Sequence, residues 1–355
     1  MQTKRLLNFD FSDVLLEWNS ANNPRTMPWK GEKDPYKIWI SEIILQQTRV
    51  EQGWKYYQRF LAAFPNVYAL SNASDQKVYK LWEGLGYYSR CRNLIDTARY
   101  IAGELNGQFP KKYEEIKKLK GIGPYTAAAI SSFAFNEPHA VVDGNVFRVL
   151  SRIFGIDIPI DVAAGKKFFN QFADNLLDKQ QPGLFNQSIM DFGATICRPI
   201  PQCGPCPFNK YCKALSGRRV LSLPVKTKQT IIRKRWFYYM LLEYRGKFAI
   251  RKRTGKDIWC NLFEFFLLES RTPLSENEML KRIKKTIWIG KNGVEIKSVS
   301  PVSQQKLTHQ IIEGRFVNLK LLHKPDFPDD VTWVKKAEIR NYAFPKFINQ
   351  YLQKF

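Results

Sequence analysis

Histidine and long apolar runs are scarce in this sequence. Only three of its 355 residues are histidines, and no Ser/His/Asp or Cys/His arrangement of a hydrolase can be built on them. No apolar run approaches the roughly 20 residues that a membrane-spanning helix needs. Residues 1–18 contain acids where a signal peptide has its apolar core. We therefore expect a cytoplasmic protein with no membrane partner.

Acidic residues are also few. The sequence contains 32 acidic and 56 basic residues, which gives a formal net charge of +24 at pH 7. Such a surplus attracts polyanions, although a generally basic surface would have the same composition. Hydrophobic residues make up 44% of the chain, which is ordinary for a globular protein and argues against global disorder. The composition indicates nucleic acid as the class of partner, and we expect the protein to be associated with the nucleoid.

The length favours two domains. Residues 1–214 are predicted to be mainly α-helical from about residue 8 onward, residues 215–235 to form a basic linker on DNA or on the protein surface, and residues 236–355 to form a smaller α+β domain. Helical patterns cover 75–83, 90–105, 125–135, 145–154 and 275–287, and strand-like patterns cover 236–244, 247–253, 262–270 and 315–322.

Two glycines lie two residues apart in LKGIGPYTAAAI, residues 119–130. Gly121 and Gly123 allow a tight turn between two short helices, and the amides that begin the second helix would then face a phosphate. This is the helix-hairpin-helix pattern, for which an ordinary helix–helix turn is the alternative.

Two carboxyl groups lie in contexts that suit acid–base chemistry. Glu42 is surrounded by apolar residues in KIWISEIILQQTRV, where Gln46 and Arg49 share its strip of a helical wheel. Burial would raise its pKa, as a general acid near neutral pH requires. A surface glutamate paired with Arg49 is the alternative. Asp143 and Asn145 stand at a predicted helix start, where capping is the common role of an aspartate.

Four of the six cysteines are crowded together with the spacing C-x5-C-x2-C-x5-C, at Cys197, Cys203, Cys206 and Cys212. In a reducing compartment this crowding indicates a metal site more readily than disulfides. Structural zinc sites usually have two C-x2-C pairs, whereas this loop has one and no nearby histidine. A [4Fe–4S] cluster is therefore favoured, and zinc remains the alternative.

Taken in order, PW, SEIILQQT, WEGLGYYSR, LKGIGPYT, VVDGNVFRVLSR and the cysteine loop resemble the adenine DNA glycosylases, the MutY family within the endonuclease III-like helix-hairpin-helix superfamily. The resemblance extends from about residue 8 to residue 355 and includes LPVK in the linker and YAFPKF near the end. It implies a monomeric base excision repair enzyme with a [4Fe–4S] cluster. Such an enzyme flips adenine mispaired with 8-oxoguanine or guanine out of duplex DNA and hydrolyses its bond to deoxyribose.

The resemblance also implies residue roles. Glu42 would protonate N7 of adenine, and Asp143 would stabilise the oxocarbenium-like sugar by charge or by a transient covalent bond. Asn145 and Tyr125 would hold the nucleotide and the water. The remaining matches are Trp29, Lys30 and Gln187 around the adenine, Gln47 and Tyr87 as wedges in the duplex, and Gln46, Thr48, Arg49, Tyr88, Gly121 and Gly123 as further DNA contacts.

Tyr125 separates this chain from relatives that also cut the DNA strand, because those carry a lysine there to form a Schiff base. The C-terminal portion resembles a MutT-like, Nudix-fold domain that recognises 8-oxoguanine, and Leu307, Thr308 and His309 match its recognition loop. The sequence contains no Nudix hydrolase motif. It departs from the family pattern at Lys30, where some relatives have arginine, at Leu307, which replaces an aromatic, and in the first cysteine gap of five residues instead of six.

Three other functions are compatible with parts of the sequence. A bifunctional glycosylase/lyase would need an amine where Tyr125 stands. A non-catalytic DNA-binding protein would have no use for Glu42 together with Asp143. A Nudix-type hydrolase with a DNA-binding appendage would need the missing metal-binding motif.

Overall fold

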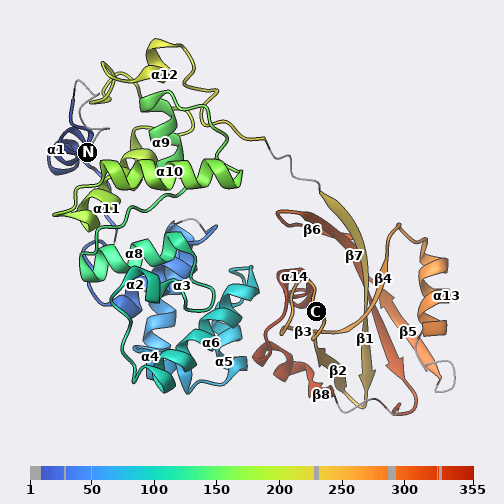
Figure 1. Ribbon diagram of the computed structural model, residues 1–355. Helices are drawn as coiled ribbons and strands as arrows, with labels where there is room; N and C mark the ends of the chain where they lie inside the picture. The colour runs from blue at the N-terminus through green and yellow to red at the C-terminus, as the bar shows by residue number, and fades with distance from the viewer. Residues whose placement is uncertain are drawn as a thin grey trace. The chain divides into compact units, whose positions relative to one another are not determined.

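The computed structural model describes residues 9–27, 29–48, 50–227, 232–286, 293–325, 327 and 330–355. The chain forms two compact units (Figure 1). The helical unit contains residues 1–72 and 93–228, and the sheet unit contains residues 229–355 together with residues 73–92. Among the described residues, no helix is both long enough and apolar enough to cross a membrane.

Among the described residues, eleven helices lie wholly or mostly in the helical unit. They are α1 (Phe11–Asn22), α2 (Pro35–Leu45), α3 (Val50–Ala63), α4 (Val67–Ser71), α6 (Tyr88–Glu104), α7 (Tyr113–Ile116), α8 (Pro124–Phe135), α9 (Gly144–Phe154), α10 (Ala163–Leu176), α11 (Pro182–Thr195) and α12 (Lys213–Ser216).

The helical unit has its main core between α1, α9, α10 and α11, which Figure 1 shows as one group beside a second group formed by α2, α3, α4 and α8. Aromatic side chains fill this core, and Trp18 meets Phe192 edge to face at 5.1 Å between ring centroids. Burial of such rings is a main source of the stability of the unit. Helix α8 packs on both α2 and α11 and so connects the two groups.

The sheet unit is built on an eight-stranded sheet in which β3, β2, β1, β7 and β5 are successive neighbours. Strand β4 pairs with β1, β6 with β7, and β8 with β2. The elements are β1 (Arg233–Tyr244), β2 (Lys247–Lys252), β3 (Phe263–Glu264), β4 (Phe266–Ser270), α13 (Glu276–Thr286), β5 (Val294–Val299), β6 (Ser303–Lys306), β7 (Gln310–Leu321), β8 (Val331–Lys335), η3 (Lys336–Asn341) and α14 (Lys346–Leu352).

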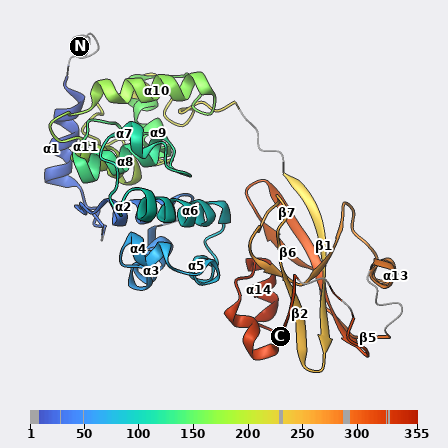
Figure 2. The same ribbon diagram turned by 60° about the horizontal axis from the view of Figure 1, so that its bottom comes forward.

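Helices α13 and α14 cover opposite faces of the sheet (Figure 2). Side chains of β1 alternate between these two helices. Tyr238 and Met240 join a cluster with Met279 of α13, whereas the ring of Tyr239 lies 6.2 Å from that of Phe347 of α14. Alternation of this kind follows from the two-residue period of a strand. Because both faces are covered, β1 is hydrophobic at every position from Trp236 to Leu242.

Helix α5 (Asp75–Trp82) and the start of α6 belong to the sheet unit. The Tyr79 hydroxyl accepts a hydrogen bond from Asn261 at 3.0 Å, and the Glu83 carboxylate accepts the Phe344 amide at 2.9 Å. The YAFPKF segment, residues 342–347, therefore binds this helix. No local pattern predicted the association, because the partners are far apart in the chain.

The segment after Cys212 packs on the helical unit as far as it is described. Leu223 is buried, its carbonyl accepts Arg152 Nε at 3.1 Å, and the Val225 carbonyl accepts the Ile160 amide at 3.1 Å. Residues 215–227 thus lie against the helical unit, and the predicted contact of the linker with DNA stays a prediction. Strand β1 begins at Arg233, before the predicted Trp236, because its pairing with β7 begins there.

Candidate active site

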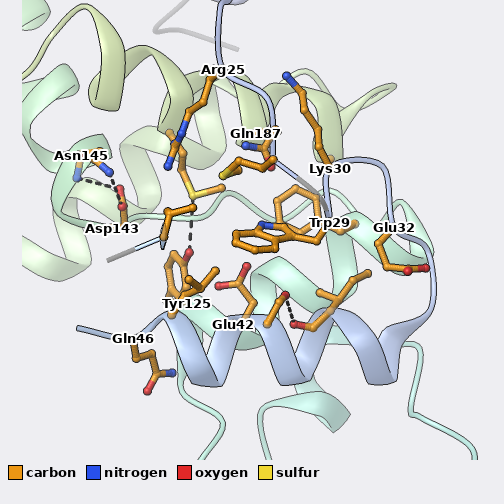
Figure 3. A pocket seen from close by; sticks show the side chains of 18 of the residues that line it. Arg25, Trp29, Lys30, Glu32, Glu42, Gln46, Tyr125, Asp143, Asn145 and Gln187 are labelled. Atoms are coloured by element: carbon orange, nitrogen blue, oxygen red, sulfur yellow. Dashed lines mark hydrogen bonds between the residues drawn. The ribbon is translucent and has the colours of Figure 1, made fainter. Parts of the chain in front are cut away.

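A cavity of about 750 Å³ opens in the helical unit between α2, α8, α11 and the start of α9. Glu42 and Asp143 both line it, and Figure 3 shows Glu42 on the α2 side, with Tyr125 nearby and Asp143 beyond. The cavity is large enough for a nucleobase, and the two predicted acids share it. Tyr125, Asn145, Trp29, Lys30, Gln187 and Gln46 line the same space.

Glu42 lies in the third turn of α2, which begins at the N-cap Asp34 and Pro35. Burial raises the pKa of Glu42 to about 7, a hydrogen bond with Tyr125 lowers it, and the charge of Asp143 raises it further. The carboxyl group therefore retains its proton near neutral pH, as a general acid must. The prediction that Gln46 continues the helical strip of Glu42 is wrong, because α2 ends at Leu45 and Gln46 is its C-cap. Arg49 lies outside the described residues.

Asp143 is the N-cap of α9, so capping and the predicted chemistry are compatible in one side chain. Its Oδ1 accepts the amides of Asn145 and Val146 at 2.8 Å each, and its Oδ2 accepts Asn145 Nδ2 at 2.9 Å. Burial raises the pKa of Asp143 above its ordinary value, and these hydrogen bonds and the charge of Arg148 offset part of that rise and favour the ionised form. Among the described residues, the hydrogen bond that influences the Glu42 side chain comes from the Tyr125 hydroxyl, so the two carboxyl groups have unlike environments.

The Tyr125 hydroxyl lies 3.6 Å from Met190 Sδ and is hydrogen-bonded to Glu42. Asn145 Oδ1 accepts Arg148 Nη2 at 2.8 Å, and the same nitrogen donates to the Gly193 carbonyl. A Cβ at Gly193 would stand 2.7 Å from Asn145 Cβ, so only glycine lets α11 approach so closely. Neither Arg148 nor Gly193 was singled out in the sequence.

The wall opposite α2 is formed by the segment between α1 and α2. The ring of Trp29 packs against the rings of Trp54 and Tyr57, and each pair of ring centroids is 5.8 Å apart. Lys30 and Gln187 line the cavity as predicted, and Arg25 does so without having been predicted. Gln46 Nε2 donates to Thr126 Oγ1 at 3.2 Å, which ties the end of α2 to α8.

Three turns carry the predicted DNA contacts. Gly121 has φ +79°, and a Cβ there would stand 2.5 Å from Asn93 Cβ, so the turn requires glycine. Gly123 is the exposed N-cap of α8, whose first amides have no partner inside the helix. Gln47 follows α2 with φ +60°, and Tyr87 precedes α6 with φ +45°. Both are exposed and strained for side-chain-bearing residues.

Two neighbours of these strained residues are placed differently. Thr48 is half-buried, and its amide donates to the Leu45 carbonyl at 3.0 Å. Tyr88 is only 7% exposed, and its hydroxyl accepts the Gly84 amide at 3.3 Å. The Tyr88 side chain therefore supports the turn before α6, and its contact with DNA stays a prediction.

Comparison with known proteins identifies two matching family models and several related proteins. A model described as "HhH-GPD superfamily base excision DNA repair protein" matches residues 40–167, and one described as "NUDIX domain" matches residues 238–354. The chain is 36% identical over 307 residues to the adenine DNA glycosylase of Buchnera aphidicola subsp. Baizongia pistaciae. The aligned residues cover 84% of this chain and 83% of that protein. It is 30% identical to the adenine DNA glycosylase of Buchnera aphidicola subsp. Acyrthosiphon pisum, with 99% of both covered.

The chain belongs to the adenine DNA glycosylase family. It is a DNA glycosylase, a hydrolase of N-glycosyl bonds that acts in base excision repair. Among solved structures, a thermostable thymine-DNA glycosylase matches the chain with a TM-score of 0.54 and 29% identity, covering 58% of this chain and 95% of that one. The predicted fold, a helix-hairpin-helix glycosylase domain followed by a Nudix-like domain, is confirmed.

The Nudix-like part of this family member presents Leu307, Thr308 and His309 in the loop between β6 and β7. The Leu307 amide donates to the Gln310 carbonyl at 2.7 Å, which closes a two-residue turn with Thr308 and His309 exposed at its tip. Thr308 Oγ1 lies 2.5 Å from the Tyr87 hydroxyl. One predicted wedge residue and one predicted recognition residue therefore meet within the sheet unit.

The four cysteines of the predicted metal loop all line one small cavity, together with Arg152 and Phe192. Arg152 is buried, and its Nη1 lies 3.7 Å from Cys197 Sγ. In the described part of the chain, no three histidine, cysteine or acidic side chains are arranged to hold a metal ion. Arg148 Nε donates to the Cys197 carbonyl at 2.7 Å, so the loop and Asn145 share one arginine.

Proposed function

We propose that this glycosylase is monofunctional and removes adenine mispaired with 8-oxoguanine or guanine. The observation that carries the proposal is the shared cavity, where a carboxyl group with a pKa near 7 and a carboxylate held by N–H donors face one space. Hydrolysis of a glycosidic bond needs one protonated and one ionised carboxyl group across the scissile bond. The curated relatives carry the name adenine DNA glycosylase, which supports adenine as the base.

In the proposed reaction, Glu42 donates its proton to N7 of the extruded adenine, which turns the base into a better leaving group. Asp143 remains ionised and stabilises the positive charge that develops on the sugar. Tyr125 orients Glu42, and Asn145, held by Arg148, positions the sugar and the attacking water. Trp29, Lys30 and Gln187 surround the base.

Duplex DNA is the proposed partner. The net charge of +24 supplies nonspecific attraction, and the Gly121–Gly123 turn offers helix N-terminal amides to a phosphate. Gln47 and Tyr87 adopt left-handed backbone conformations while exposed, which suits residues that wedge into a base stack. Extruding a base from the duplex costs a few kcal/mol of free energy, and extruding a mispaired base costs less.

Recognition of 8-oxoguanine is assigned to the Tyr87–Thr308 pair and to His309. A hydroxyl group and an imidazole exposed at the tip of a turn can bond the edge of a base opposite the extruded nucleotide. Thr308→Ala with His309→Ala should reduce the preference for 8-oxoguanine over guanine, measured as the ratio of kcat/KM on the two duplexes. An unchanged ratio would assign the preference elsewhere.

A single-turnover assay tests the proposal as a whole. Duplexes with adenine opposite 8-oxoguanine, guanine, cytosine or thymine are incubated with the protein and then treated with alkali to cut at abasic sites. We expect alkali-dependent cleavage opposite 8-oxoguanine and guanine. Absence of cleavage on all four duplexes would exclude adenine excision.

Omission of the alkali tests whether the enzyme is monofunctional. Tyr125 offers no amine for a Schiff base, so we expect intact strands and no covalent complex with borohydride. Efficient β-elimination with borohydride trapping would instead favour the bifunctional glycosylase/lyase.

A [4Fe–4S] cluster is the proposed cofactor. The four cysteines line one cavity, and their loop has a single C-x2-C pair with no nearby histidine, whereas structural zinc sites usually have two such pairs. The buried Arg152 would offset part of the negative charge of the thiolates. A bound cluster would cross-link the loop through four Fe–S bonds.

Metal and sulfide analysis decides between the two metals. We expect iron with acid-labile sulfide and absorbance near the blue end of the visible range. Cys206→Ser should lose that absorbance and lower the Tm. Stoichiometric zinc without sulfide would contradict the cluster.

A further inference from the structure

A third carboxylate lies directly behind the wall of the cavity. Asp191 on α11 has no exposed surface, and both of its oxygens are hydrogen-bonded. Oδ1 accepts Arg25 Nη1 at 2.9 Å and Gln187 Nε2 at 2.8 Å. Oδ2 accepts Asn23 Nδ2 at 2.9 Å and Lys30 Nζ at 3.4 Å. Asp191 does not line the cavity itself, whereas three of its four partners do.

The described part of segment 23–34 contains turns but no helix or strand, so its side-chain contacts matter for its position. Its backbone makes a few local bonds, such as Lys30 N to the Met27 carbonyl at 3.0 Å. Charge-assisted hydrogen bonds to a buried carboxylate are stronger than neutral ones. Asp191 therefore fixes Arg25 and Lys30, and with them the segment that carries Trp29 over the cavity (Figure 3).

Asp191 also balances the charge of two cations that line the same cavity as Glu42. Arg25 and Lys30 are two cations at the wall that faces Glu42, and the field of Arg25 reaches Tyr125, the hydrogen-bond partner of Glu42. If the Asp191 carboxylate were absent, the charges of Arg25 and Lys30 would not be offset, and they would stabilise the ionised form of Glu42. Nearby opposite charges favour the charged form of a carboxyl group.

We propose that Asp191 is a positioning residue for base excision: it holds Arg25, Lys30 and Gln187 in the wall of the nucleobase cavity and offsets the two cations opposite Glu42. The inference rests on the proposed function and acts entirely through side chains that line the cavity. A purely structural ion pair would hold the fold without influencing the protonation of Glu42.

The pH dependence of kcat/KM separates these two roles. Among the described residues, the titratable groups that line the cavity with Glu42 are Tyr125 on α8, Asp143 before α9, and Arg25, Lys30, Glu32 and Lys33 before α2. Helices α3 and α11 add no titratable side chain to this lining. Of these groups, only Arg25 and Lys30 contact Asp191.

Asp191→Asn is expected to lower kcat/KM on an A:G duplex by about 10²-fold, because the wall residues shift. It should also move the alkaline limb of the pH profile to lower pH by about one unit, since the unbalanced cations favour ionised Glu42. Lys30→Met removes one cation, and its alkaline limb should move to higher pH. The double variant should return the limb towards that of the wild type.

Asp174→Asn is the matched control, because Asp174 caps the Ala140 amide at 2.9 Å and does not line the cavity. Its alkaline limb should coincide with that of the wild type. If Asp191→Asn does not fold, the shift in Lys30→Met decides, because Lys30 makes the longest bond to Asp191 and is exposed. If the alkaline limb of the pH profile stayed at the wild-type pH in both Asp191→Asn and Lys30→Met, the inference would be overturned. A wild-type protein that excises no adenine would instead refute the proposed function.

Discussion

Glu42→Gln is expected to abolish adenine excision while binding of a mispaired duplex stays nearly intact. Glutamine has the shape of the protonated carboxyl group and can still accept the Tyr125 hydrogen bond, but it has no acidic proton to transfer to the base. Loss of a general acid typically lowers the rate by about 10²- to 10⁴-fold. Here the upper end is expected, because the other carboxyl groups among the described cavity residues are Asp143, which accepts three N–H hydrogen bonds, and Glu32, whose pKa is lowered. Single-turnover rates and duplex affinity, measured on the same protein, test this.

The wild-type pH profile gives the sign of the effect. Because burial raises the pKa of Glu42 to about 7, the protonated acid is present below that pH and is lost above it. The kcat/KM of the wild type should therefore fall about tenfold per pH unit on the alkaline side. Glu42→Gln should lack this limb, and Glu17→Gln, an exposed position on α1, should retain it. Parallel loss of binding and turnover in Glu42→Gln would make Glu42 a structural residue.

Much of the candidate site could be predicted because each part has a local signal. Glu42 is conspicuous as an acid among apolar neighbours, and Asp143 as the residue before a helix. The helical patterns at 125–135 and 145–154 differ from α8 and α9 by one residue at the start. Strands β1, β2 and β7 were predicted because apolar side chains recur along them.

Other parts had no local signal. Strand β5 has four consecutive exposed residues and so lacks the alternation that predicts a strand, and β6 and β8 are short. The predicted strand 262–270 divides at Phe265 into β3 and β4, which pair with different neighbours. Asp191 looks like one polar residue of an amphipathic helix, and its partner Arg25 is 166 positions away. Contacts at such separations depend on the fold, and helical periodicity does not reveal them.

Asp143→Asn is the second substitution with a large expected effect, and it separates the charge of Asp143 from its capping role. Asparagine caps helices about as well as aspartate, so α9 should remain capped and the Tm should change little. The developing positive charge on the sugar would lose its counter-charge. Removal of such electrostatic stabilisation typically costs about 10²- to 10³-fold in rate.

Asp10→Asn provides the matched control for this prediction, because Asp10 caps α1 in the same way, by accepting the amides of Ser12 and Asp13, and lies outside the cavity. Both variants exchange an N-cap aspartate for asparagine, so any general cost of the exchange should appear in both. Only Asp143→Asn should lose single-turnover excision, and its binding of an A:G duplex should persist. If the two variants retained similar activity, the charge of Asp143 would have no part in the reaction, and its place at the cavity would reflect helix capping alone.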